Sequence, residues 1–163
     1  MKQGLKKHYY VMIWPALIVV LLDQISKYVL VQTLQLHHSV SVIAGFFKFA
    51  HVRNRGMAFG FMNRMGVGFS AWFFAGACLV AIILLLFWFT RLKEEERRIG
   101  LALSLIMGGA VGNLIDRVRL GEVIDFLDFY VGSFHWPAFN VADSAITVGT
   151  FCVVASLIFK KQK

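Results

Sequence analysis

Four apolar segments, each near the length needed to cross a lipid bilayer, constrain this 163-residue chain more than any other feature. A transmembrane helix needs roughly 20 mostly apolar residues, and the segments at 9–31, 67–90, 99–115 and 141–159 approach or reach that length. Hydrophobic residues make up 58% of the chain and charged residues only 16%, whereas soluble domains average about 25% charged residues. The sequence therefore predicts a mainly α-helical membrane protein: a four-transmembrane-helix bundle that forms a single domain over 1–163.

Basic residues at the segment ends predict the orientation of this bundle. They precede the first segment, lie between the second and third, and follow the fourth (Lys2, Lys6, Lys7; Arg91, Lys93, Arg97, Arg98; Lys160, Lys161, Lys163). Because Lys and Arg concentrate on the cytoplasmic side of membrane proteins, both termini are expected in the cytoplasm and the loops 32–66 and 116–140 outside. This topology also accounts for the net charge of +8, so we expect no binding to nucleic acid.

The first outer loop carries a signal for strands. Polar and apolar residues alternate over 39–42, a second strand-like run covers 46–52, and Asn54, Arg55 and Gly56 follow with the composition of a turn. We therefore expect a small extracytoplasmic β-sheet, built from this loop, on the outer face of the bundle.

Four aspartates are expected to gather at the outer membrane boundary. Asp23 lies in the outer half of the first segment, Asp116 ends the third, Asp143 lies in the first turn of the fourth, and Asp125 lies in the loop between the last two. Charged side chains within a bilayer are costly, and a bundle that holds several at one level usually uses them. Two uses remain open at this point: movement of protons or ions, and acid–base catalysis.

Paired carboxylates suit peptide hydrolysis because two that share a site cannot both ionise cheaply, so that one keeps a proton while the other is charged. Other protease designs fit poorly. The chain has no His-Glu-x-x-His zinc motif and no Gly-x-Ser-x-Gly elbow. Ser26 and Lys27 are adjacent and point to different faces of a helix. We expect neither a metal ion nor a cofactor.

Four blocks of residues carry a resemblance to a known family. They read Asp-Gln-Ile-Ser-Lys at 23–27, Asn-Arg-Gly-Met-Ala-Phe at 54–59, Gly-Asn-Leu-Ile-Asp-Arg at 112–117 running on to Gly-Glu-Val-Ile-Asp-Phe at 121–126, and Phe-Asn-Val-Ala-Asp-Ser at 139–144. In order and spacing they resemble the lipoprotein signal peptidases over nearly the whole chain. One departure is Met57, where the family more often has Ala, a change that is expected to affect the substrate groove and not the catalytic pair.

The resemblance implies an aspartic endopeptidase of the bacterial cytoplasmic (inner) membrane. Such enzymes remove the signal peptide from a prolipoprotein, cutting before a cysteine that carries a diacylglyceryl group. On the matching motifs the catalytic residues are Asp125 and Asp143, with the active site at the outer leaflet. The implied partners are this lipidated substrate and membrane phospholipid, and nothing in the sequence requires more than a monomer.

Each proposed site residue also has a simpler structural interpretation. Asn140 and Asp143 match an N-cap and its third residue, and Asn54 with Gly56 matches a turn. Asp23 and Lys27 are spaced for an ion pair within one helix, or Asp23 supports the site while Lys27 meets a lipid headgroup or the substrate. We expect supporting or substrate-binding roles for Asp23, Lys27, Asn54, Gly56, Asn113, Asp116, Arg117 and Asn140, with Asp116 and Arg117 forming a charge cluster and Asn113 a polar tie between helices.

Two other functions compete with the protease. A small proton- or ion-coupled transporter would use Asp23, Asp116 and Asp143 as a relay, although transporters usually bind near the midplane between internal repeats, and no repeat is visible here. A non-catalytic assembly factor would tolerate amide replacements of both Asp125 and Asp143. Glycines at 108, 109 and 112 include a Gly-x-x-x-Gly pair, which predicts close helix packing.

Overall fold

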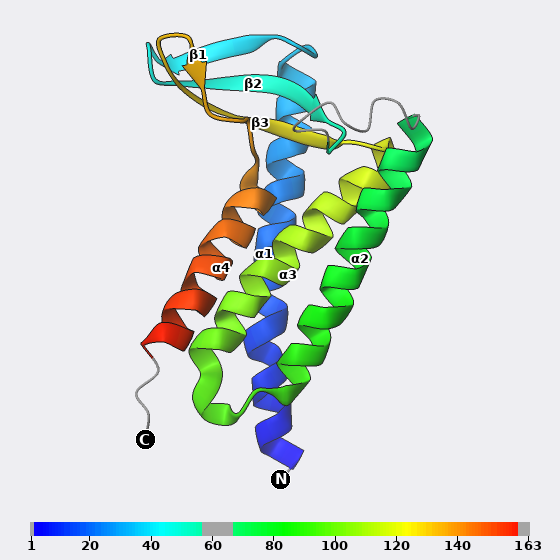
Figure 1. Ribbon diagram of the computed structural model, residues 1–163, viewed down its shortest axis with the longest axis vertical. Coiled ribbons are helices and arrows are strands. Elements are labelled where there is room, and N and C mark those ends of the chain that lie inside the picture. Colours follow the sequence, from blue (N-terminus) through cyan, green and yellow to red (C-terminus); the bar gives the residue numbers. More distant parts are fainter. Residues whose placement is uncertain (1, 57–66, 160–163) are drawn as a thin grey trace.

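The computed structural model describes residues 2–56 and 67–159 and forms a helical bundle with a sheet across one end (Figure 1). The long helices are α1 (Lys2–Thr33), α2 (Val67–Arg91), α3 (Arg97–Leu120) and α4 (Val141–Ile158), with a short 3-10 turn, η1 (Glu94–Glu96), before α3. In the part of the chain described, four helices are long and apolar enough to cross a membrane. The predicted class, a four-helix membrane bundle with a small sheet, is confirmed. Met57 and the rest of 57–66 lie outside the described residues.

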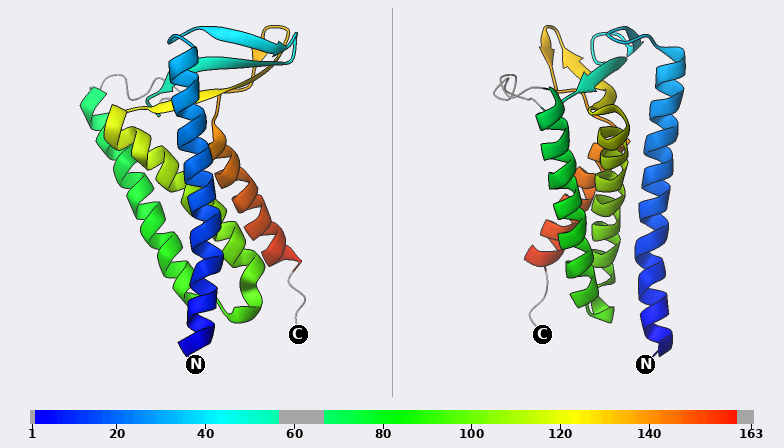
Figure 2. Two further views of the ribbon diagram at one scale, coloured as in Figure 1. Left: turned by 180° about the vertical axis from the view of Figure 1, so that it is seen from behind. Right: turned by 90° about the vertical axis from the view of Figure 1, so that its right-hand side faces the viewer.

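Helix α3 is the central element of the bundle because it packs against each of the other three helices. Its glycines make this possible. A Cβ on Gly108 would lie 2.7 Å from the Ala16 carbonyl oxygen on α1, and one on Gly109 would lie 2.3 Å from the Ala142 carbonyl oxygen on α4. The predicted use of these glycines for close packing is therefore met on two different faces of α3. Figure 2 shows α3 between α1, α2 and α4 from two further directions.

The third helix is longer than predicted, so that Asp116 and Arg117 lie in the helix and not in the loop that follows it. The predicted segment ended at residue 115, whereas α3 continues to Leu120, where Gly121 caps it with φ +75° and donates its N–H to the Arg117 carbonyl. Glycine is the residue that adopts this left-handed conformation without strain. Asp116 and Arg117 are consequently helical, and the charge of Asp116 is met by Lys27 on α1 at 2.8 Å.

The sheet contains four strands, two of which come from the 116–140 loop, where no strand was predicted. Strands β1 (Ser39–Ile43) and β2 (Phe47–Asn54) match the predicted pair, and β3 (Val123–Val131) and β4 (Phe134–His135) extend the sheet in the order β1-β2-β3-β4. The expectation that Asp125 lies in a loop was wrong. Its segment is held as a strand because it pairs antiparallel with β2, Val52 opposite Asp125 and Asn54 opposite Val123.

Strand β3 lies across the end of the bundle opposite the N-terminus and joins the sheet to the helices (Figures 1 and 2). Ile124 and Phe126 on this strand are buried and form a cluster with Leu30 of α1. A larger apolar cluster around Phe89 and Leu103 holds α2 and α3 together further down. Asp125, which lies between Ile124 and Phe126 on β3, is thereby fixed relative to α1 and to the start of α4, where Val141 packs against the same cluster.

Candidate active site

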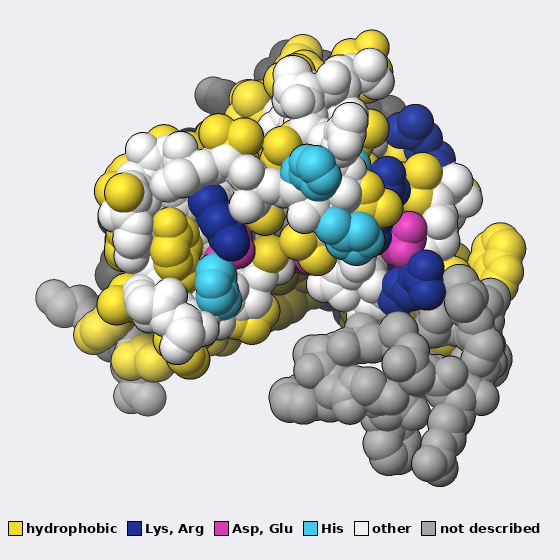
Figure 3. Space-filling model, turned by 90° about the horizontal axis from the view of Figure 1, so that it is seen from above, with side chains coloured by type: hydrophobic (Ala, Val, Ile, Leu, Met, Phe, Trp, Pro, Cys, Tyr) yellow, Lys and Arg dark blue, Asp and Glu magenta, His cyan; other side chains and the backbone are white. Residues whose placement is uncertain are grey.

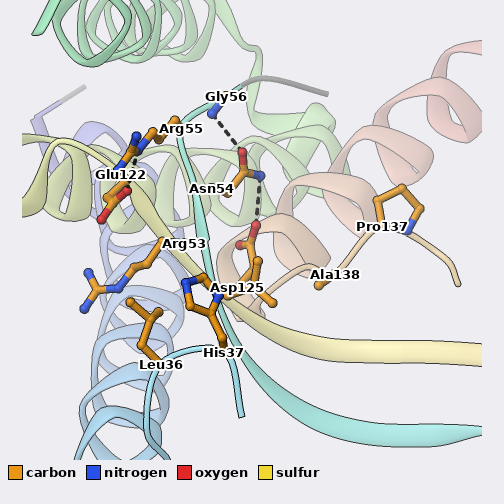
Figure 4. Close-up of a pocket in the computed structure, with 11 residues that line it drawn as sticks. Leu36, His37, Arg53, Asn54, Arg55, Gly56, Glu122, Asp125, Pro137 and Ala138 are labelled. Atoms are coloured by element: carbon orange, nitrogen blue, oxygen red, sulfur yellow. Dashed lines mark hydrogen bonds and ion pairs between the residues drawn. The ribbon is translucent and has the colours of Figure 1, made fainter. Parts of the chain in front are cut away.

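Asp125 is a buried carboxylate on β3 that accepts hydrogen bonds at both oxygens. Its exposed fraction is 1%. Asn54 Nδ2 donates to Oδ2 at 2.8 Å and Asn140 Nδ2 donates to Oδ1 at 2.7 Å. Asn54 reaches it because residues two apart on a strand share a face, which puts Asn54 diagonally across from Asp125 in the β2–β3 register. Figure 4 shows the Asn54–Asp125 contact at the edge of a pocket.

Burial raises the pKa of Asp125 to about 6 from an ordinary value of 3.8, because the ionised form loses its hydration. The hydrogen bond from Asn54 acts in the opposite direction by stabilising the charged form, and the neighbouring charge of Asp143 raises the pKa further. The hydrogen bond from Asn140 and the charge of Lys27 make smaller contributions that lower it. Asp125 is therefore a carboxyl group that can hold a proton close to neutral pH.

Asp143 lies in the first turn of α4, beside Asp125. The N-cap of this helix is Asn140, whose Oδ1 accepts the Asp143 backbone N–H at 2.9 Å. The Asp143 side chain is held from α3, since Asn113 Nδ2 donates to its Oδ1 at 2.7 Å. Asn140 thus binds the side chain of Asp125 and the backbone of Asp143 at once. The N-cap interpretation of Asn140 is met, and the same side chain also joins the two aspartates.

Beneath the two aspartates, Lys27 forms a buried ion cluster with Asp23 and Asp116. Its ammonium group lies 2.8 Å from Asp23 Oδ2, 2.8 Å from Asp116 Oδ2 and 3.3 Å from Asn113 Oδ1, so all three N–H groups have acceptors. The Lys27 side chain is 2% exposed. Lys27 therefore faces protein carboxylates and not a lipid headgroup or the substrate, as one expectation had it. The ion pair with Asp23 within α1 is present but is one part of a larger cluster.

Arg117 does not form the expected charge cluster with Asp116. Neighbouring residues of a helix point in different directions, and Arg117 turns toward α2. Its Nη1 donates to the Asn113 carbonyl at 3.4 Å and to Cys78 Sγ at 3.6 Å, and its guanidinium lies 5.7 Å from the centre of the Phe74 ring. Arg117 therefore fixes the first half of α2 against α3.

Gly56 closes the turn that carries Asn54. It has φ +80°, and its N–H donates to Asn54 Oδ1 at 2.8 Å, which leaves the Asn54 Nδ2 group aimed at Asp125. A Cβ at this position would also overlap the Phe74 ring, at 2.3 Å from its nearest atom. Asn54 consequently both stabilises the turn and contacts Asp125, so its two expected roles coexist.

A pocket of about 600 Å³ opens beside Asp125 (Figure 4). Its walls come from strand β2, the segment between α1 and β1, the start of β3 and the segment before α4 (Leu36, His37, Val52, Arg53, Asn54, Arg55, Gly56, Glu122, Asp125, Pro137, Ala138). Among residues 2–56 and 67–159, no three His, Cys, Asp or Glu side chains are placed to hold a metal ion together. The arrangement offers two neighbouring carboxylates with fixed amide donors, next to a space large enough for a peptide segment.

Sequence reasoning gave Gln24 no role, although this half-buried side chain bridges two carboxylates of the buried cluster. Its Nε2 group donates to Asp23 Oδ2 at 3.1 Å, to Asp116 Oδ1 at 3.1 Å and to the Gly112 carbonyl at 3.2 Å. The available signal was an amide directly beside an aspartate in the middle of an apolar segment, where a polar side chain needs a partner.

Comparison with known proteins identifies the family. A sequence model described as Signal peptidase (SPase) II matches residues 15–159. The lipoprotein signal peptidase of Syntrophus aciditrophicus is 43% identical over 146 residues, which cover 90% of this chain and 91% of that protein. The lipoprotein signal peptidase of Cupriavidus taiwanensis is 47% identical over 148 residues, which cover 91% of this chain and 82% of that protein.

Solved structures agree with the sequence relatives. Two crystal structures of bacterial membrane enzymes obtained by the in meso method superpose with a TM-score of 0.81 each, at 33% and 34% identity. The matches cover 93% of this chain and 92% and 94% of those chains. A bacterial four-helix membrane bundle with these relatives over nearly its full length belongs to the signal peptidase II family, the lipoprotein signal peptidases.

Proposed function

We propose that this protein is an aspartic endopeptidase that removes the signal peptide from diacylglyceryl-modified prolipoproteins, cutting just before the lipidated cysteine. The family supports a protease that acts on lipoprotein precursors. The aspartic mechanism is supported by Asp125 and Asp143, two carboxylates from different elements that share one polar residue, Asn140. This bridge is the observation that carries the proposal, because acid–base hydrolysis needs two carboxyl groups held at a fixed separation.

In the proposed reaction one water molecule lies between the two carboxyl groups. The ionised carboxylate takes a proton from the water as its oxygen attacks the scissile carbonyl, and the protonated carboxyl group donates a hydrogen bond to the carbonyl oxygen. The tetrahedral intermediate then collapses by breaking its C–N bond, and the carboxyl group that took the proton from water gives it to the nitrogen of the departing lipidated cysteine. The elevated pKa of Asp125 supports a dyad that keeps one proton near neutral pH.

The position of the site suits a substrate that is half peptide and half lipid. The start of α1 and the end of α4 lie at one end of the bundle, and the sheet lies at the other (Figure 1). Asp125 is on β3 of that sheet. With the basic residues that precede α1, join α2 to α3 and follow α4 on the cytoplasmic side, the two aspartates are at the outer leaflet and both termini are in the cytoplasm. Lysine, arginine and histidine side chains are visible on the upper face, among hydrophobic ones (Figure 3).

The decisive experiment incubates the purified full-length chain, in lipid nanodiscs, with a synthetic prolipopeptide carrying a diacylglyceryl-cysteine. Mass spectrometry should find cleavage before the lipidated cysteine, unchanged by a chelator. Asp125→Asn and Asp143→Asn should each lower kcat by about 100- to 10,000-fold, the usual contribution of acid–base catalysis, while thermal unfolding stays cooperative. A matched control is Asp128→Asn, because Asp128 also lies on β3 but pairs with Lys48 and His135. Substantial cleavage by either dyad variant would refute the aspartic assignment.

A transporter is not favoured by the placement of the acidic residues. Asp23, Asp116, Asp125 and Asp143 lie toward one end of the bundle, and the remaining acidic residues are Glu122 and Asp128 by the sheet and Glu94, Glu95 and Glu96 at the opposite turn. No acidic residue lies between these two levels, so a carboxylate relay across the membrane has no intermediate group.

A further inference from the structure

The two proposed catalytic residues are each preceded by a residue whose backbone N–H is bound by a buried carboxylate. Asp23 Oδ1 accepts the N–H of Ala142, the residue before Asp143, at 2.9 Å. Asp116 Oδ2 accepts the N–H of Ile124, the residue before Asp125, at 3.2 Å. One carboxylate comes from α1 and the other from α3, so each half of the dyad is fastened to a different helix.

The same two carboxylates are tied to each other by two side chains of α1. Lys27 Nζ lies 2.8 Å from Asp23 Oδ2 and 2.8 Å from Asp116 Oδ2. Gln24 Nε2 spans the same pair, 3.1 Å from Asp23 Oδ2 and 3.1 Å from Asp116 Oδ1. Asp23 and Lys27 are at most 2% exposed and Asp116 is 3% exposed at its side chain, so water does not compete for the two ion pairs of Lys27. Gln24 itself is half-buried.

From this closed set of contacts we propose that Asp23, Gln24, Lys27 and Asp116 form a clasp that sets the separation of Asp125 and Asp143. The clasp acts on the backbone, through Ala142 and Ile124, and does not touch the reacting atoms; its members are positioning residues. This inference rests on the proposed function, because it assigns these residues to the geometry of that dyad. In this proposal Gln24 and the buried Lys27 both act by holding Asp23 and Asp116, and through them the two catalytic residues, in place.

A second contact links the clasp to the dyad side chains. Lys27 Nζ donates to Asn113 Oδ1 at 3.3 Å, and this oxygen also accepts from Asn140 Nδ2 at 3.3 Å. With its oxygen engaged twice, the Asn113 amide must point its Nδ2 group at Asp143, as observed at 2.7 Å. The clasp therefore fixes both the backbone of Asp143 and the donor that orients its carboxylate.

Gln24 offers the sharpest test because its replacement by an apolar residue removes a bridge without leaving a buried charge unpaired. Lys27 would still neutralise Asp23 and Asp116 in Gln24→Leu and in Gln24→Met. The matched control is Gln32→Leu, the same change two turns later on α1, where the side chain is exposed. The assay uses the full-length chain in nanodiscs with the diacylglyceryl-cysteine prolipopeptide, and thermal unfolding is measured in parallel.

Loosening the clasp should lower kcat and leave KM unchanged, because the pocket that holds the peptide is intact. A displacement on the order of 1 Å between catalytic groups costs up to about 100-fold in rate.

The alkaline limb of the pH profile of kcat/KM should also move to lower pH in the Gln24 variants. Two like charges move apart when released, and the charge of Asp143 then raises the pKa of Asp125 less. The charged and titratable groups facing Asp125 are unchanged in these variants (Asp143, Lys27, Arg53, Arg55, Glu122, His37).

Three results would overturn the clasp. One is wild-type kcat in both Gln24 variants. Another is a loss of activity that parallels the loss of thermal stability while the alkaline limb stays at its wild-type pH, which would mean that Gln24 serves folding alone. Failure of both Gln24 variants to fold would lead to the same conclusion. The third is an equal loss in Gln32→Leu. The proposed function is tested separately, since activity in Asp125→Asn or Asp143→Asn would refute the dyad whatever Gln24 does.

Discussion

Asn140 donates a 2.7 Å hydrogen bond to the carboxylate of Asp125 from a position that is fully buried. Its oxygen at the same time caps α4 by accepting the Asp143 N–H. The oxygen of Asn140 therefore stabilises α4, and its nitrogen orients Asp125 relative to Asp143. Substitutions of Asn140 can separate these two effects.

Asn140→Ala and Asn140→Ser should differ in stability but not in activity. Alanine removes the cap and costs about 1 kcal/mol of stability from that cause alone, whereas serine is itself a good N-cap and recovers part of it. Neither residue supplies the amide donor to Asp125, so both variants should cleave the lipopeptide poorly. Thermal unfolding and cleavage rate, measured on the same preparations, decide the matter; an active Asn140→Ser variant would show that the amide donor is dispensable.

Asn54→Ala should move the alkaline limb of kcat/KM to higher pH. The hydrogen bond from Asn54 stabilises the ionised form of Asp125 and lowers its pKa, so its loss makes the dyad keep its proton to higher pH. In the wild-type free enzyme this limb is expected at about pH 6, the pKa of Asp125. The cleavage rate is measured as a function of pH at saturating and at limiting lipopeptide concentrations, which gives the pH profiles of kcat and of kcat/KM. Ser41→Ala, on the exposed strand β1, is the control, and an unshifted limb in Asn54→Ala contradicts the expectation.

Asp125→Asn should gain stability relative to the wild type as the pH rises from 4 to 7. The pKa of Asp125 is raised on folding from 3.8 to about 6, so the native state binds the proton more tightly than the unfolded chain does. The stabilisation from this group is complete below about pH 3.8 and is lost as the pH rises through about 6. The asparagine variant lacks this dependence. Thermal midpoints of both proteins across this pH range test it, and a constant difference would argue against the raised pKa.

Lys27→Met should destabilise the protein by about 3–5 kcal/mol, the usual cost of leaving a buried charge without its partner. Here two buried carboxylates, Asp23 and Asp116, would lose the same cation. The double variant Lys27→Met/Asp116→Asn should recover part of the loss because one uncompensated charge is removed. Yield and thermal unfolding in nanodiscs are the measurements. Equal stability of Lys27→Met and the wild type would mean that the cluster is not held by its charges.

Gly109→Ala should separate α3 from α4 and reduce both stability and cleavage. The added Cβ would lie 2.3 Å from the backbone carbonyl of Ala142, next to Asp143, and neither backbone can yield without moving α4. Gly76→Ala on α2 is the matched change, because a Cβ there has no atom within 4 Å. That variant should be as stable as the wild type or more so, since alanine favours helix over glycine. Equal effects of the two changes would contradict the packing argument.

Helices α2 and α4 and strands β1 and β2 could be predicted from the sequence because each is encoded by a short run of neighbouring residues. Apolar runs that must bury their backbone polar groups in lipid can only be helices, and α2 and α4 follow their predicted segments within a residue or two. The alternation before Asn54 predicted β1 and β2. The motif resemblance also named both aspartates before their contacts were visible. These results depend on length, periodicity and residue order, all of which can be read along the chain.

The strand character of β3, the partners of Lys27 and the place of Gln24 could not be read in this way. Strand β3 exists because β2 pairs with it and α1 covers it, and these are contacts between residues far apart in sequence. Lys27 could have pointed to headgroups or inward, and only the approach of α3, permitted by its glycines, put Asp116 within 2.8 Å.

The amino-acid sequence by itself thus determined which segments are long and apolar enough to cross a membrane and which carboxylates are available near one end of them. Tertiary structure alone decided which of them meet, because the energy of a buried charge depends on partners that packing brings within hydrogen-bond distance.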